Sequence, residues 1–139
     1  MKCIVLAAGK DKNSIEKIPK CLRTAGNKTV LGSLVDTFNN NFAADIYLVG
    51  GFEILQIMEK YPDLNYFYNE KWKDTKSLYS LSKAFITTNS DSFISYSDVV
   101  HRSETLKLIQ QDSVNVFYDS LWKTRYENRD LNNLEKVID

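Results

Sequence analysis

The chain has 139 residues, of which 43% are hydrophobic and 26% are charged. A chain of this length and composition can bury one hydrophobic core, so we expect residues 1–139 to form a single domain and exclude disordered, collagen-like and membrane-embedded classes. Lysine plus arginine and aspartate plus glutamate number 18 each, and this formal charge of zero argues against nucleic acid as a partner.

The cysteines and the N-terminal segment indicate the compartment. Cys3 and Cys21 are too few and too poorly spaced for a zinc site or a disulfide framework, so we expect reduced thiols. The apolar run over 3–8 is too short for a signal peptide or a membrane span. We therefore expect a cytoplasmic protein with no membrane partner.

Short apolar runs alternate with amphipathic segments, which is the pattern of βαβ units. In chain order, the pattern predicts a strand over 3–7, a helix over 29–39, a strand over 45–49, a helix over 52–60, a strand over 65–68, a helix over 76–85, a strand over 92–97, a helix over 103–110 and a strand over 114–118. The first strand is apolar throughout, as in a strand covered on both faces. We therefore predict a three-layer α/β fold with a mostly parallel sheet.

A turn of small residues follows the first predicted strand. Residues 6–10 read Leu-Ala-Ala-Gly-Lys, and Lys10, Lys12, Lys17 and Lys20 surround the turn with positive charge. Small side chains let backbone N–H groups approach a ligand, so the stretch has the outline of a phosphate cradle. The same residues also fit a tight strand exit with solvated lysines, and the Gly-Lys-Ser/Thr of a P-loop is missing.

Several segments, in order along the chain, resemble the MobA-like and sugar-phosphate nucleotidyltransferases. They are Leu-Ala-Ala-Gly at 6–9, Pro-Lys at 19–20, the segment 26–29, the Gly-Gly turn within 47–52, Asn, Thr and Ser-Leu at 69, 75 and 80–81, the strand-end aspartate within 95–100, and Asp, Trp, Tyr and Arg at 119, 122, 126 and 129. The last spacing is similar to the branch that acts on phosphocholine or 2-aminoethylphosphonate. The resemblance implies a Rossmann-like fold of the nucleotide-diphospho-sugar transferase type, with this chain as its nucleotide-binding half, shortened at the C-terminus.

The resemblance also implies a reaction and the residues that perform it. CMP from CTP, or another nucleotide from its NTP, would pass to a small phosphorylated or phosphonate acceptor with Mg²⁺ and release of pyrophosphate, a reaction catalysed mainly by positioning and charge neutralisation. Lys20 is the implied catalytic residue, and Asp98, after a strand end, is the implied Mg²⁺ ligand. The implied nucleotide-binding residues are Leu6, Ala7, Ala8, Gly9, Lys10, Lys20 and Ser80, and the implied acceptor-binding residues are Trp122, Tyr126 and Arg129.

Two departures from the family pattern leave alternatives open. Asp11 stands where the family has a glycine and Asn13 where it has a basic residue, and an aspartate facing a triphosphate would repel it. The acceptor region and a second metal-binding aspartate are not identified before Asp139. A noncatalytic, degenerate nucleotide-binding or regulatory module of the same fold is therefore the alternative, and a second copy or a partner chain could complete the site. A response-regulator-like domain would need an acidic pair after the first strand.

The only histidine has no second metal ligand at a useful spacing. We therefore expect His101 to be a solvated residue that follows a strand.

Overall fold

The structure is a computed structural model that describes residues 1–10, 15, 17–85, 91–110, 113–125 and 127. Its contacts divide the chain into two compact units, Met1–Leu108 and Ile109–Asp139, and each is described by itself. Compact units can belong to one folding domain, so the single domain over 1–139 stays a prediction.

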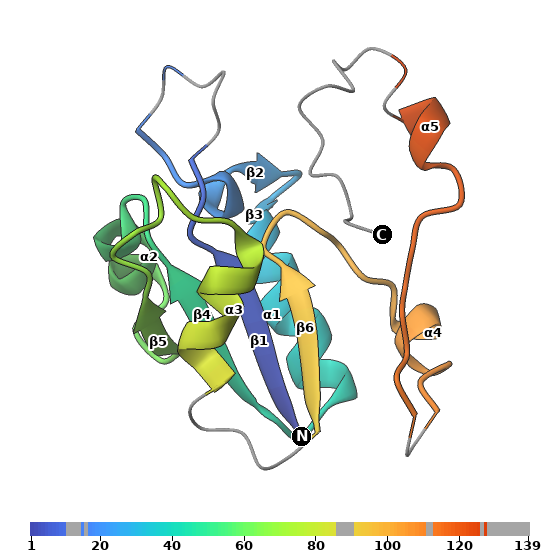
Figure 1. Cartoon of the computed structure of the whole chain (residues 1–139). Coiled ribbons are helices and arrows are strands. Elements are labelled where there is room, and N and C mark those ends of the chain that lie inside the picture. Colours follow the sequence, from blue (N-terminus) through green and yellow to red (C-terminus); the bar gives the residue numbers. More distant parts are fainter. Residues whose placement is uncertain (11–14, 16, 86–90, 111–112, 126, 128–139) are drawn as a thin grey trace. The chain divides into compact units, whose positions relative to one another are not determined.

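The first unit is built on a parallel sheet of four strands in the order β5-β4-β1-β6 (Figure 1). The strands are β1 (Lys2–Ala7), β4 (Asp45–Gly50), β5 (Asn65–Tyr68) and β6 (Ser92–Tyr96). β1 lies in the interior of the sheet, where Lys2 is in register with Asp45 on one side and with Ser92 on the other. The predicted strands 3–7, 45–49, 65–68 and 92–97 and their parallel arrangement are confirmed.

Helices cover the two faces of this sheet, which confirms the three-layer α/β fold. Figure 1 shows α3 (Ser77–Phe85) on one face and α1 (Val30–Asn41) on the other. α1 begins where the Thr29 hydroxyl accepts a hydrogen bond from Gly32 N at 3.0 Å. α2 (Ile54–Lys60) connects β4 to β5, and α4 (Ser103–Leu106) follows β6.

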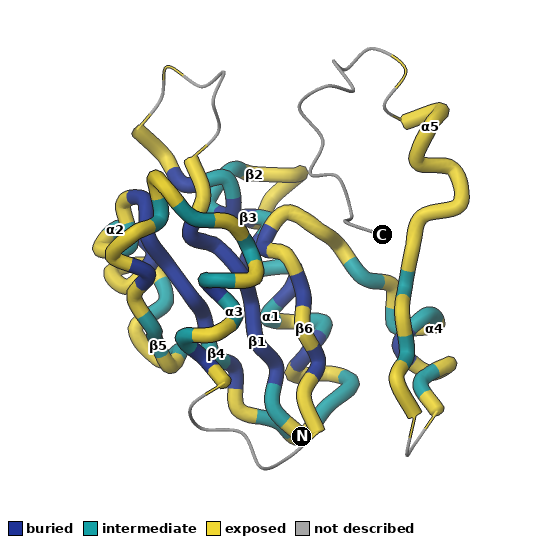
Figure 2. Tube along the Cα trace, viewed as in Figure 1, coloured by how far each residue is buried: buried dark blue, intermediate teal, exposed yellow. Residues whose placement is uncertain are grey.

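The core lies on both sides of β1, which is buried from Cys3 to Ala7 (Figure 2). Ile4 and Leu6 point to the α3 side, where they form a buried cluster with Ala84. On the α1 side, Phe38 packs edge-on against Phe93 with ring centroids 5.3 Å apart. Burial on both faces accounts for the unbroken apolar run of the first strand.

A small hairpin that the sequence did not predict precedes α1. The 3₁₀ helix η1 (Lys20–Leu22) leads into β2 (Thr24–Ala25) and β3 (Lys28–Thr29), which pair in antiparallel fashion. Gly26 has a φ of 71° at the turn, a left-handed conformation that glycine adopts without steric cost. Strands of two residues are too short to show an alternating pattern, which is why they were not predicted.

Two predicted elements were wrong in extent or type. The helix predicted over 103–110 ends at Leu106, which is its one buried residue. Beyond it, Leu108 N donates to Thr105 O, the i→i−3 hydrogen bond of a 3₁₀ turn and not that of an α-helix. The strand predicted over 114–118 is not formed, since these residues carry no regular secondary structure, and Val114 is 94% exposed. Alternating apolar residues form a strand only where a neighbouring strand supplies hydrogen bonds and burial.

The second unit contains one described helix, α5 (Trp122–Arg125), which has no buried residue. Within the described ranges, no helix is both long enough and apolar enough to cross a bilayer.

Candidate functional site

The turn that follows β1 is fixed by the turns that follow its two neighbouring strands. The carbonyl oxygen of Ala8 accepts a hydrogen bond from Phe52 N at 3.0 Å, and that of Leu6 accepts one from Ser97 N at 3.0 Å. After β1 the chain continues to β4, which pairs with one edge of β1, and later returns to β6, which pairs with the other edge. The carboxyl ends of β1 and β6 therefore border a topological switch point, where open α/β sheets bind ligands.

Lys20 and Asp98 meet at this switch point. Their Nζ and Oδ2 atoms are 3.9 Å apart, and the two side chains are 40% and 49% exposed. An exposed ion pair of this kind contributes at most about 1 kcal/mol to stability. Each of the two groups can therefore leave its partner and bind a ligand instead at little cost. The predicted catalytic lysine and the predicted metal ligand therefore face the same space.

Buried neighbours hold the backbone on both sides of Lys20. Pro19 and Cys21 are both fully buried, so η1 is anchored to the core while the lysine side chain reaches solvent. Burial raises the pKa of the Cys21 thiol to about 12, so this cysteine stays protonated and serves packing.

The predicted cradle presents its backbone to the site. Leu6, Ala7 and Ala8 are buried, so their side chains fill the core and only backbone atoms are free to contact a ligand. Gly9 has open space on its outer side, since a Cβ there would meet nothing within 4 Å. Lys10 extends over the ring of Phe52, with 5.3 Å from its Nζ to the ring centroid.

A buried asparagine organises the loop between β5 and α3, and this role was missed from the sequence. Asn69 is fully buried, and its Nδ2 donates to Thr75 Oγ1 and Ser80 Oγ, each at 3.0 Å. Its Oδ1 accepts from Lys71 N at 2.9 Å. Ser80, predicted to touch the base, is itself buried, so its hydroxyl holds the loop through Asn69. The spacing of these three polar residues was visible in the sequence, but the full burial of the Asn69 amide after a strand was not.

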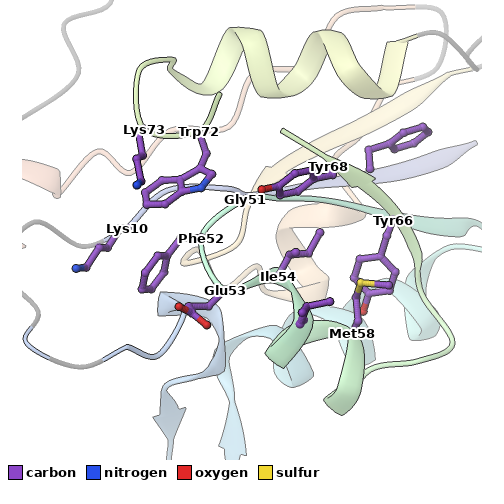
Figure 3. Close-up of a pocket in the computed structure, with 12 residues that line it drawn as sticks. Lys10, Gly51, Phe52, Glu53, Ile54, Met58, Tyr66, Tyr68, Trp72 and Lys73 are labelled. Atoms are coloured by element: carbon purple, nitrogen blue, oxygen red, sulfur yellow. The ribbon is translucent and has the colours of Figure 1, made fainter. Parts of the chain in front are cut away.

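Gly51 lets an aromatic side chain close over the turn after β4. A Cβ at Gly51 would lie 2.5 Å from Trp72 Cβ and 2.8 Å from the Ala8 oxygen, so only glycine fits (Figure 3). The rings of Phe52 and Trp72 then meet edge-on, with centroids 5.4 Å apart. The loop 69–76 is thereby packed directly on the turn that follows β1.

His101 is placed differently from the prediction of a solvated residue. Its ring packs against Phe38 and Phe93 at centroid distances of 6.2 and 5.2 Å, and its Nε2 lies 2.8 Å from Ser95 Oγ. Burial lowers the pKa of His101, which favours the neutral ring. The aromatic residues come from α1 and β6, which is why no local sequence signal indicated the contact. His101 thus fastens the segment that carries Asp98 to the core.

No cluster of three or more metal-ligating side chains lies within the described ranges. The ion pair places the Asp98 carboxylate beside Lys20. A single carboxylate suits Mg²⁺, which commonly combines one or two carboxylates with substrate phosphates and water.

The predicted acceptor residues belong to the second unit. Trp122 is 40% exposed in α5, whereas Tyr126 and Arg129 lie outside the described residues. Asp11 and Asn13, the two departures in the loop, also lie outside them. The acceptor site therefore stays a prediction.

Comparisons with known proteins agree with this architecture. No family model matches the chain. Over 98 residues the chain is 33% identical to the bifunctional protein GlmU of Ruthia magnifica subsp. Calyptogena magnifica, a match that covers 69% of this chain and 22% of that protein. The solved CTP:phosphocholine cytidylyltransferase from Streptococcus pneumoniae has a TM-score of 0.60 and 25% identity, over 70% of this chain and 44% of that one.

A nucleotidyl transferase from Methanothermobacter thermautotroptrophicus shares the fold, with a TM-score of 0.60, 18% identity, and coverage of 70% of this chain and 50% of that one. The chain therefore shares the α/β fold of these solved nucleotidyltransferases. The chain spans half or less of the length of each of these three proteins.

Proposed function

We propose that this chain is the nucleotide-binding half of a nucleotidyltransferase that transfers CMP from CTP to a small phosphate or phosphonate. The observation that carries the proposal is the meeting of Lys20 and Asp98 at the switch point, beside the backbone turn after β1. A cation, a hard oxygen ligand and exposed backbone N–H groups are the parts that phosphoryl transfer uses.

In this reaction an oxygen of the acceptor phosphate attacks the α-phosphorus of the nucleotide. A new P–O bond forms, the bond to the bridging oxygen breaks, and pyrophosphate leaves with the electron pair. Lys20 would neutralise the charge that develops on the α-phosphate oxygens, because its ammonium is held at the end of an anchored 3₁₀ helix. The Ala8–Gly9 backbone would orient the nucleotide.

Asp98 fits the role of Mg²⁺ ligand, since its exposed carboxylate faces the space in which Lys20 would hold phosphate. Mg²⁺, when bound, would supply further charge neutralisation on the phosphates. In the free protein the Lys20 ammonium takes the place of Mg²⁺ beside the Asp98 carboxylate, so this carboxylate has a positively charged partner.

The choice of CTP and of a choline-like or phosphonate acceptor rests on similarity. The structural relative at 25% identity is a CTP:phosphocholine cytidylyltransferase. Trp122 and Tyr126 are aromatic residues of the type that bind a quaternary ammonium, and Arg129 could hold a phosphonate in bidentate fashion.

Pyrophosphate release tests this proposal. The full chain with Mg²⁺ is assayed with each of the four NTPs against phosphocholine, 2-aminoethylphosphonate and glucose 1-phosphate. Release with CTP and either of the first two acceptors is the expected result. Preference for glucose 1-phosphate would overturn the acceptor assignment, and CTP binding without release by any pair would favour a noncatalytic nucleotide-binding module.

A further inference from the structure

A second concave site lies on the α2 side of the sheet, next to the site described above. It is a groove of about 880 Å³, bordered by α2, the edge strand β5 and the loop after β5 (Figure 3). This volume is within the range of pockets that hold small organic molecules. The switch-point residues Lys20 and Asp98 do not line it.

One end of the groove is apolar and open to solvent. Figure 3 shows Ile54, Met58 and Tyr66 gathered at this end. Leu55 also lines the groove and is 74% exposed, and Met58 is 39% exposed. Exposed apolar residues that converge on a concavity are typical of a binding site.

The other end of the groove carries two ammonium groups. Lys10 and Lys73 both extend to the end where Phe52 and Trp72 lie (Figure 3). The Nζ atom of Lys10 lies 5.3 Å from the Phe52 ring centroid, and that of Lys73 lies 5.5 Å from the Trp72 ring centroid. Within the described part of the chain, neither ammonium has a carboxylate at ion-pair distance.

Among the described residues that line the groove, Glu53 carries the acidic group. Its carboxylate accepts a hydrogen bond from Gln56 Nε2 of α2 at 3.1 Å. Two lysines against one glutamate leave these described residues with an excess positive charge.

We propose that this groove binds a small amphipathic anion, with an aromatic body against Ile54, Met58 and Tyr66 and an anionic group between Lys10 and Lys73. The charge at one end and the apolar lining at the other select for this polarity. An uncharged molecule would leave both ammonium groups unused, and an inorganic anion would leave the apolar end exposed to water.

The site would be distinct from the nucleotide site although Lys10 is near both. The Phe52 N–H that bonds to Ala8 joins the wall of the groove to the turn after β1. The apolar end is formed by α2 and β5, which contribute no residue to the switch point.

Fluorescence titration tests the proposal on the full chain. Trp72 and Trp122 are the two tryptophans, so Trp122→Phe leaves Trp72, which lines the groove, as the reporter. The probe is 8-anilinonaphthalene-1-sulfonate, and its uncharged parent 1-anilinonaphthalene is the matched control. We expect saturable one-site quenching of Trp72 by the sulfonate, with weaker binding of the parent.

Two variants locate the binding. Lys73→Gln should weaken sulfonate binding about two- to fivefold, the range of one exposed ion pair, and leave the parent unchanged. Leu55→Glu should weaken both probes, whereas Leu78→Glu should weaken neither. Leu78 is a fair control because it is 78% exposed on α3 and does not line the groove.

Three outcomes would overturn the proposal. Equal affinity for the two probes would show that charge plays no part. An equal loss in the Leu55 and Leu78 variants would place the binding elsewhere. Displacement of the uncharged parent by CTP would show that the groove is part of the nucleotide site. Since the titration needs no CTP binding, failure of the proposed function would leave its result unaffected.

Discussion

Lys20 owes its position to its two buried chain neighbours, Pro19 and Cys21, while its own ammonium forms an ion pair with the half-exposed carboxylate of Asp98. Because the pair is weak, a phosphate bound as proposed could replace Asp98 at Lys20 without a large loss. We therefore expect Lys20 to contribute to the proposed catalysis more than to stability.

Lys20→Ala should lower turnover in the pyrophosphate assay about 10²- to 10³-fold, the usual effect of removing one group that stabilises the transition state. Its urea unfolding midpoint should stay close to that of the wild type. Lys60→Ala is the control, since Lys60 ends α2 and lines a cavity together with Asp45, which begins β4, and neither Lys20 nor Asp98 lines that cavity. Equal losses in the two variants would remove Lys20 from the catalytic role.

The burial of His101 predicts that the stability of the folded protein falls at acidic pH. Burial lowers its pKa in the folded state below the ordinary value of 6.5, so the folded protein prefers the neutral ring. The stabilisation is complete above pH 6.5 and declines as the pH falls below it, because the unfolded chain takes up the proton first. His101→Gln should reduce the loss of unfolding free energy between pH 7.5 and 5.5. The same loss in wild type and variant would contradict this assignment.

At the scale of elements, two contacts hold the loop 69–76. Asn69 donates a hydrogen bond to Ser80 of α3, and Trp72 packs against Gly51 after β4. These contacts join β4, β5 and α3 around the turn after β1. The strands and helices themselves followed from apolar periodicity, but these joints depend on residues far apart in sequence. The hairpin before α1 and the loss of the strand at 114–118 have the same cause, since pairing partners are not encoded locally.

Asn69→Leu should lower the free energy of unfolding by about 1–3 kcal/mol, because Thr75 and Ser80 lose their donor inside the protein. Asn65→Ala is the comparison, since Asn65 is exposed and makes one long bond of 3.3 Å to Ile46 O. Urea unfolding measures both. A loss for Asn69→Leu no greater than for Asn65→Ala would show that the network does not hold the loop.

Gly51→Ala should be destabilised by about 1–3 kcal/mol, because the added methyl group overlaps Trp72 Cβ and the Ala8 oxygen. Gly9→Ala should unfold at nearly the wild-type temperature, since its Cβ would enter open space. Thermal unfolding followed by circular dichroism compares the two. A stable Gly51→Ala would mean that Trp72 is not packed on the turn.

At the scale of the whole molecule, the first unit brings together the sequence features that lie far apart in the chain. Residues 6–10, Lys20 and Asp98 converge because β1 lies between β4 and β6 and the four strands of this sheet run in parallel. This convergence could be predicted from the order of elements. The apolar groove beside α2 could not, because the spacing of Ile54, Leu55 and Met58 is that of any amphipathic helix.

Calorimetric or thermal titration of the full chain with CTP and Mg²⁺ tests the central claim, that the carboxyl ends of β1 and β6 form a nucleotide site. We predict that CTP stabilises the protein more than ATP or GTP does, by about 2.7 kcal/mol at 100 times its Kd. Lys20→Ala and Asp98→Asn should each reduce that gain. Unchanged stability at millimolar CTP, or an equal gain in both variants, would contradict the claim.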